Sequence, residues 1–306
     1  MYGLSQGLLS QRHGVGHWID CTSHLRGVSG SVAQIDSNMP SSNGAEMGEQ
    51  QAVETVLARP VRAVDVERPW LWLRAGWRDF LAAKSISLTF GLMISAASLI
   101  LISLLWQVDL LPYVLPLAAG FMFLAPAFAI CFYEISRRLE RKEPVRLEQV
   151  ATAWRPHVSQ IAFMGLVMVL FQMVWIRIAT LIFALFFGSQ PASWDRFITV
   201  LFFSTDGIPF LVVGTLVGGI LAVLSFAISV TAFPMLLDRD VGAAAAIATS
   251  VHAAARNWRV MIGWAALIVL FTAAGLVTLC LGLAVTMPLI GHASWHAYRD
   301  LIADED

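Results

Sequence analysis

The chain has 306 residues, of which 58% are hydrophobic and only 13% are charged, and its mean hydropathy is +0.70. A soluble domain carries roughly 25% charged residues, so this composition excludes an ordinary soluble protein and predicts an integral membrane protein. The net charge of −1 gives no indication of a polyanionic partner, and we expect the lipid bilayer, not nucleic acid, as the main partner.

Residues 1–57 differ from the rest of the chain. They are rich in Ser, Gly, Gln and Asn and show no helical periodicity, which predicts disorder. An alternative is that translation starts at Met39 or Met47, so that the residues before it are not part of the protein. The integral membrane domain is expected over residues 68–301, followed by an acidic tail at residues 302–306.

Charge-free apolar runs then follow one another along the chain. A helix needs about 20 apolar residues to cross a bilayer, and several runs are at least this long. Only Arg177 interrupts the third of them. The first four runs cover residues 85–108, 110–133, 161–188 and 207–237.

Amphipathic segments precede three of the predicted spans. In each, apolar residues recur at helical spacing, which is typical of a helix lying in the membrane interface. A fourth short interfacial helix is expected around Trp194, Phe197, Leu201 and Phe202. The three stripes are Trp70, Leu73, Trp77 and Phe80; Leu147, Val150, Ala151 and Trp154; and Ile247, Val251, Ala254 and Trp258.

The last apolar stretch, residues 258–300, has no charged residue between Arg259 and Arg299. Its 43 residues would form a helix of roughly 64 Å, about twice the ~30 Å hydrocarbon core. Two helices turning near Gly275 to Gly282 therefore fit better than one. This gives six spans, with five spans as the alternative.

Each amphipathic stripe is also linked to a Trp-Arg dipeptide, at Trp77-Arg78, Trp154-Arg155 and Trp258-Arg259. The repetition predicts three degenerate units, each a surface helix followed by a span out and a span back. Lys and Arg gather before the first, third and fifth spans, whereas the alternate connections hold only Arg196. The positive-inside rule then places the N-terminus, the surface helices and the C-terminus in the cytoplasm.

Three blocks carry a family resemblance: PWLWLRAGWRDF, APAFAICFYEISRRLERKEP and GHASWHAYRDL. Together they resemble DUF2189, a bacterial family of predicted integral membrane proteins, over roughly residues 68–301. The resemblance implies a multi-span protein of the bacterial inner (plasma) membrane. It supplies no catalytic or binding residues.

Few residues in the spans could carry chemistry. Arg177 is the one charge well inside a span, and such residues usually face the bundle interior or water. It could contact an anion or substrate, pair with Asp109 or Asp206, or extend to the membrane surface. Glu134 is explained by a pair with Arg138 at i,i+4.

His292 and His296 lie four residues apart and share one face of a helix, a spacing used by metal and haem ligands. They are weak metal candidates, because HExxH is absent and no cysteine lies nearby. We interpret them instead as polar anchors at the membrane interface, beside Trp295 and Tyr298.

The sequence therefore predicts an all-α transmembrane bundle of three hairpins with cytoplasmic interfacial helices. No catalytic, cofactor-binding or metal residue is assigned, and no cofactor or enzymatic activity is expected. A non-catalytic accessory or structural role is predicted, alone as a homo-oligomer or with a membrane protein partner. The alternatives are a small-solute or ion transporter or channel that uses Arg177, and a redox or metal-binding subunit that uses His292 and His296.

Overall fold

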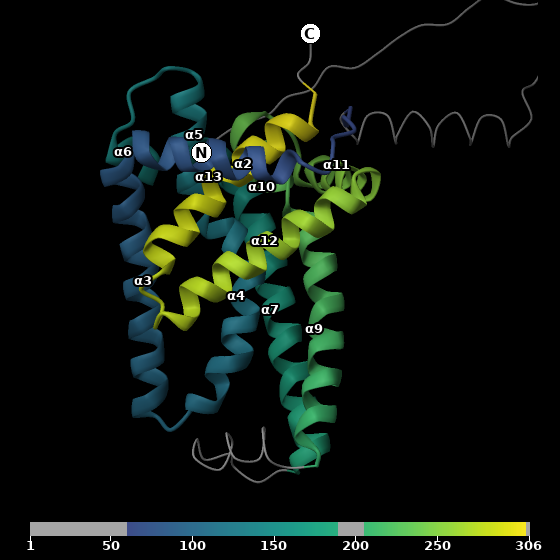
Figure 1. Cartoon of the computed structure of the whole chain (residues 1–306). Helices are drawn as coiled ribbons and strands as arrows, with labels where there is room; N and C mark the ends of the chain where they lie inside the picture. Colours follow the sequence, from purple (N-terminus) through teal and green to yellow (C-terminus); the bar gives the residue numbers. More distant parts are fainter. Residues whose placement is uncertain (1–59, 189–204, 304–306) are drawn as a thin grey trace, which may run out of the picture. The chain divides into compact units, whose positions relative to one another are not determined.

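A computed structural model describes residues 60–188 and 205–303 (Figure 1). The chain divides into the units Met1–Ala52 and Val53–Asp306, and every described residue belongs to the second unit. Three predictions lie outside the described residues: disorder or a later start within residues 1–57, the interfacial helix around Trp194, and the end of the acidic tail.

The described residues form helices, together with one isolated antiparallel bridge between Val61 and Ile302. The predicted all-α fold is thereby confirmed. The α-helices are α2 (Arg68–Ala82), α3 (Lys84–Gln107), α4 (Val114–Phe128), α5 (Ile130–Glu140), α6 (Leu147–Ala151), α7 (Val158–Phe187), α9 (Gly207–Ser229), α10 (Ala232–Asp238), α11 (Ala243–Arg256), α12 (Trp258–Val277) and α13 (Leu283–Leu301), and the 3-10 helices are η2 (Leu111–Tyr113) and η3 (Arg155–His157).

Five segments in this part of the chain are long and apolar enough to cross a membrane: Lys84–Gln107, Val114–Glu140, Leu147–Phe187, Gly207–Asp238 and Trp258–Val277. The multi-span prediction is confirmed at this level. Helix α13 is not among the five, so a sixth span is not shown. The predicted break in the last apolar stretch is present, because α12 ends at Val277 and α13 begins at Leu283.

Two of the long segments consist of two consecutive helices. Helix α4 contains Pro126 and ends at Phe128, and Ala129 alone separates it from α5. Helices α9 and α10 are separated at Val230 and Thr231, so Pro234 lies in the first turn of α10. Proline is tolerated there, because the amides of a first turn have no partner within the helix.

Short helices precede three long ones, as the sequence predicts: α2 before α3, α6 before α7, and α11 before α12. The predicted apolar stripe of α2 is only half correct. Leu73 and Phe80 are buried, whereas Trp70 and Trp77 are exposed. The buried face instead includes Trp72 and Gly76, because this side of α2 packs against α13.

Helix α13 lies at the centre of the core and packs against α2, α3, α5 and α12 (Figure 1). Glycines allow the closest approaches. A Cβ on Gly76 of α2 would lie 2.6 Å from the backbone nitrogen of Ala293, and a Cβ on Gly291 would lie 2.6 Å from Cβ of Phe132 on α5. By contrast, α3 and α9 leave most of their apolar side chains exposed, as helices in contact with lipid do.

Candidate functional site

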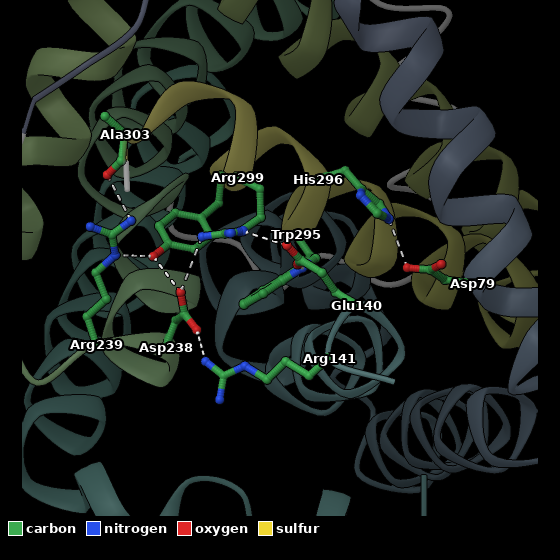
Figure 2. A network of polar contacts seen from close by, with 10 residues as sticks. Asp79, Glu140, Arg141, Asp238, Arg239, Trp295, His296, Arg299 and Ala303 are labelled. Atoms are coloured by element: carbon green, nitrogen blue, oxygen red, sulfur yellow. Dashed lines mark hydrogen bonds and ion pairs between the residues drawn. The ribbon is translucent and has the colours of Figure 1, made fainter. Parts of the chain in front are cut away.

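Helices α5, α10 and α13 each end in an adjacent acidic and basic residue, and these ends meet at one end of the bundle (Figure 2). The three elements come from distant parts of the sequence. We call the following residues the charged ring: Glu140, Arg141, Asp238, Arg239, Tyr298 and Arg299.

Asp238 connects the three helices of the charged ring. Its carboxylate accepts a hydrogen bond from Arg141 Nη2 at 2.8 Å and one from Tyr298 Oη at 3.0 Å, and Arg299 Nη1 lies 3.8 Å away. Only 8% of its side chain is exposed. A carboxylate at this depth needs such partners, because burial removes its hydration.

Glu140 closes the charged ring from the α5 side. Its carboxylate accepts from Trp295 Nε1 at 2.8 Å and from Arg299 Nε at 3.0 Å (Figure 2). Arg239 donates from Nε to Tyr298 Oη at 2.8 Å and from Nη2 to the Ala303 carbonyl at 3.0 Å. Each side chain of the charged ring therefore bonds to a residue on another element.

A second polar group lies deeper, around His292. This ring is completely buried, with Nε2 3.0 Å from Ser87 Oγ on α3 and Nδ1 2.9 Å from Ser136 Oγ on α5. On α13, one turn further along, His296 Nε2 lies 2.8 Å from the Asp79 carboxylate of α2. Ser136 also hydrogen-bonds to Asp79.

Ser87, His292, Ser136 and Asp79 thus form a continuous series of polar contacts. The direction of each hydrogen bond at the His292 ring is set by which of its two nitrogens carries the proton. Burial alone would raise the pKa of Asp79, but hydrogen bonds from His296 and Ser136 and the charge of both histidines lower it below the ordinary 3.8.

The order Ser87, His292, Ser136, Asp79 resembles the nucleophile, base and orienting acid of a hydrolase. However, Ser87 is completely buried between α3 and α13, so its hydroxyl has no access to a substrate. What the arrangement does is bind α2, α3, α5 and α13 together through polar groups that satisfy one another.

Further ion pairs lie beside these groups. The carboxylate of Asp300 on α13 accepts hydrogen bonds from two residues of α2, from Trp72 Nε1 at 2.6 Å and from Arg68 Nη1 at 3.3 Å. The predicted pair of Glu134 and Arg138 is confirmed, with 2.6 Å between Arg138 Nε and Glu134 Oε1, and Arg137 binds the other carboxylate oxygen.

The two histidines singled out by spacing do not converge on one point, since each contacts partners on different helices. Among the residues that the structure describes, no group of three or more His, Cys, Asp or Glu could hold a metal ion. Their interpretation as interface anchors is wrong for His292, which lies inside the protein together with Trp295 and Tyr298. These side chains are buried because α2 covers this part of α13.

Arg177 lies on an exposed face of α7, and within the described ranges no hydrogen bond or ion pair joins it to Asp109 or Asp206. Asp79, Ser87 and Asp238 were not predicted from the sequence. A repeated pattern in the sequence could have indicated Asp238. Aromatic residues followed by a charged turn occur in FYEISRRL and in WHAYRDL, and FPMLLDRD, which contains Asp238, is a third example.

Residues 114–238, from α4 to α10, match the family DUF2189, described as a predicted integral membrane protein. The predicted resemblance is confirmed for this segment, which includes the block APAFAICFYEISRRLERKEP. The blocks at residues 69–80 and 291–301 lie outside the match. Comparisons with curated proteins and with solved structures gave no match.

Proposed function

We propose that this integral membrane protein has a non-catalytic, structural or accessory role, acting in a complex with a membrane protein partner or with copies of itself. The observation that carries the proposal is the mutual pairing of the charged ring. Arg299 pairs with both Glu140 and Asp238, and Asp238 also pairs with Arg141. Groups used in this way hold the helices in place, whereas catalysis and transport need groups that face a bound ligand.

The surface of α2 supports a role in the interface or in assembly. Trp70 and Trp77 are exposed beside Arg74 and Arg78, which gives this face both aromatic and basic character. Tryptophan and arginine are the residues enriched at the centre of protein interfaces and at membrane interfaces. An outward face of this composition fits lipid headgroups or a second membrane protein.

We also propose a bacterial inner membrane location with both ends of the second unit in the cytoplasm. Val61 pairs with Ile302, and Arg62 N donates to the Leu301 carbonyl at 2.8 Å, so these two segments lie on the same side. Basic residues concentrate at that end, on α2, in the segment after α5 and around α11. The positive-inside rule assigns such an end to the cytoplasm.

The test is purification from native membranes in a mild detergent, with the mass of the intact particle measured. A structural role predicts a particle of defined stoichiometry that contains another membrane protein or further copies of this chain. The matched variant is Asp238→Asn, which should reduce the amount of folded protein and of complex together. A monomer that moves solute across a liposome membrane would contradict the proposal.

A transporter is the second candidate, favoured by the two interrupted segments α4–α5 and α9–α10. Broken helices at membrane depth are a common feature of substrate sites in transporters. Gln172 adds a buried side-chain oxygen without a hydrogen-bond partner, packed against Gly120 of α4. Chloride and potassium fluxes in proteoliposomes test this candidate, with Arg177→Leu as the variant that should abolish a flux dependent on that charge.

The third candidate, a redox or metal-binding subunit, rests on His292 and His296 alone. Elemental analysis and a visible absorption spectrum of the purified protein test it. Stoichiometric metal or a Soret band that His296→Gln removes would support this role.

A further inference from the structure

The buried residues of helix α3 show how far the α12–α13 hairpin extends along the bundle. Its buried residues are Ser87, Gly91 and Ser95, four residues apart on one face, and no residue of α3 beyond Ser95 is buried. Ser87 bonds to His292, and a Cβ on Gly91 would collide with the Ala284 carbonyl and lie 2.9 Å from the Pro288 ring. The buried stripe is therefore the contact with α13.

The depth of the hairpin follows from this contact. Ala284 is the second residue of α13, so the turn at residues 278–282 lies just beyond Gly91, close to the level of Ser95. From Ser95 to Gln107, α3 continues for roughly 18 Å at ~1.5 Å per residue. Figure 1 shows the same relation: α12 runs obliquely, and its turn lies part-way along α3, short of the end where α3 leads into α4.

The turn is apolar although it is exposed. Val277, Leu279 and Leu281 are 83%, 75% and 60% exposed, and no charged residue lies between Arg259 and Arg299. Thr278 and Gly282 are ordinary turn residues, but the side chains that the turn exposes are large and apolar, and exposed apolar patches mark a surface that contacts lipid or protein. The composition of this turn fits hydrocarbon.

Much of the backbone in and after the turn is hydrogen-bonded within the hairpin. The amides of seven consecutive residues, from Cys280 to Thr286, all donate hydrogen bonds within the hairpin. Thr278 contributes twice, since its Oγ1 accepts from Gly282 N at 2.9 Å and donates to the Gly275 carbonyl at 2.9 Å. Irregular backbone is tolerated at membrane depth only where its polar groups are satisfied by the protein.

We infer that α12–α13 is a re-entrant hairpin, which enters and leaves the membrane on the same side and places its apolar turn among lipid acyl chains near the middle of the bilayer. The chain then crosses the membrane four times, through α3, α4–α5, α7 and α9–α10. Helix α12 is long enough to cross, but its oblique course directs that length sideways. An even number of crossings agrees with the pairing of Val61 and Ile302.

Site-directed labelling tests the inference in the full chain, reconstituted in vesicles of one orientation with Cys21, Cys131 and Cys280 replaced by alanine. Single cysteines are placed at Leu279 in the turn, at Gln107 at the end of α3, and at Arg74 on α2. A charged maleimide should label Gln107→Cys from one side and Arg74→Cys from the other. Leu279→Cys should react from neither side, because a thiol in hydrocarbon does not form the reactive thiolate, and should react once the protein is unfolded in a denaturing detergent.

Two labelling results overturn the inference. Labelling of Leu279→Cys from the same side as Gln107→Cys would make α12 and α13 full crossings, and labelling from the Arg74 side would place the hairpin in water. Depth is measured independently with a fluorophore on Leu279→Cys and lipids brominated at different chain positions. Quenching should be strongest for bromine near the chain ends, and quenching strongest near the headgroups would also refute the inference. Val277→Cys serves as a second position should Leu279→Cys fold poorly.

Discussion

The close approach of α2 and α13 can be tested by adding a single methyl group with Gly76→Ala. The new Cβ would lie 2.6 Å from the backbone nitrogen of Ala293 and 2.9 Å from its Cα. Both atoms are backbone, so neither can move without moving α13. Normal contact needs ~3.5 Å, so the two helices must separate by roughly 1 Å.

The separation also affects hydrogen bonds between the same two helices. The distance from Trp72 Nε1 to the Asp300 carboxylate is 2.6 Å, and that from His296 Nε2 to the Asp79 carboxylate is 2.8 Å. A further ~1 Å would take both past the ~3.2 Å limit of a good hydrogen bond. Overpacking costs about 1–3 kcal/mol, while alanine gains about 1 kcal/mol over glycine within a helix. These two contributions leave a net loss of roughly 0–2 kcal/mol, and weakening of the two hydrogen bonds by about 1 kcal/mol in total brings the expected loss to roughly 1–3 kcal/mol.

Thermal unfolding of the purified protein in one detergent measures this loss. At roughly 2–4 °C per kcal/mol, Gly76→Ala should lower the Tm by about 2–12 °C. Gly165→Ala is the matched control, because a Cβ on Gly165 of α7 meets nothing within 4 Å. The control should melt at the same temperature as the parent or above it. Equal or higher Tm for Gly76→Ala would refute the close contact between α2 and α13.

Three further substitutions test the polar groups. Asp238→Asn should cost about 1–3 kcal/mol, because the nearly buried carboxylate loses its charge-assisted hydrogen bonds with Arg141 and Tyr298. Denaturant unfolding should show little change for the exposed control Asp109→Asn, and equal losses would contradict the role of the charged ring. The pKa of Asp79 is lowered in the folded state, so the stability that its carboxylate contributes is present at neutral pH and is lost as the pH falls through 3.8 toward the folded pKa. The difference in Tm between the parent and Asp79→Asn should therefore shrink on acidification. A difference that stays constant would refute the stabilising role of the Asp79 carboxylate. Arg177→Leu should leave the folded yield in detergent unchanged, and a large fall would reveal an internal partner for that charge.

The sequence was most informative about the apolar runs, because crossing a bilayer requires many uncharged residues in succession. The same reasoning located the break in the last stretch, since 43 residues are too many for one crossing, and α12 and α13 separate at residues 278–282. Depth was not predictable in this way. Hydropathy reports how apolar Leu279 and Leu281 are, but the contact of Gly91 with Ala284 determines how far the hairpin extends.

The polar site was recognised only in part. Spacing indicated that His292 and His296 share a face of a helix, and this is correct. Their partners could not be predicted, because Ser87 lies 205 residues from His292 and Asp79 lies 217 residues from His296. The stripe on α2 was wrong for a related reason. Apolar periodicity favours Trp70 and Trp77, whereas the face that packs against α13 is the one where Gly76, which lacks a Cβ, allows a close approach.

The central position of α13 has a consequence for biogenesis. Helices α2 and α3 leave the ribosome some 200 residues before the helix that completes their packing, and during synthesis the face with Ser87 and Gly91 has no partner. Contacts this distant in sequence delay completion of the fold. The nascent chain therefore needs lipid or an insertion factor to cover that face until α13 arrives, and a chain stopped before Leu283 should be degraded as an orphan.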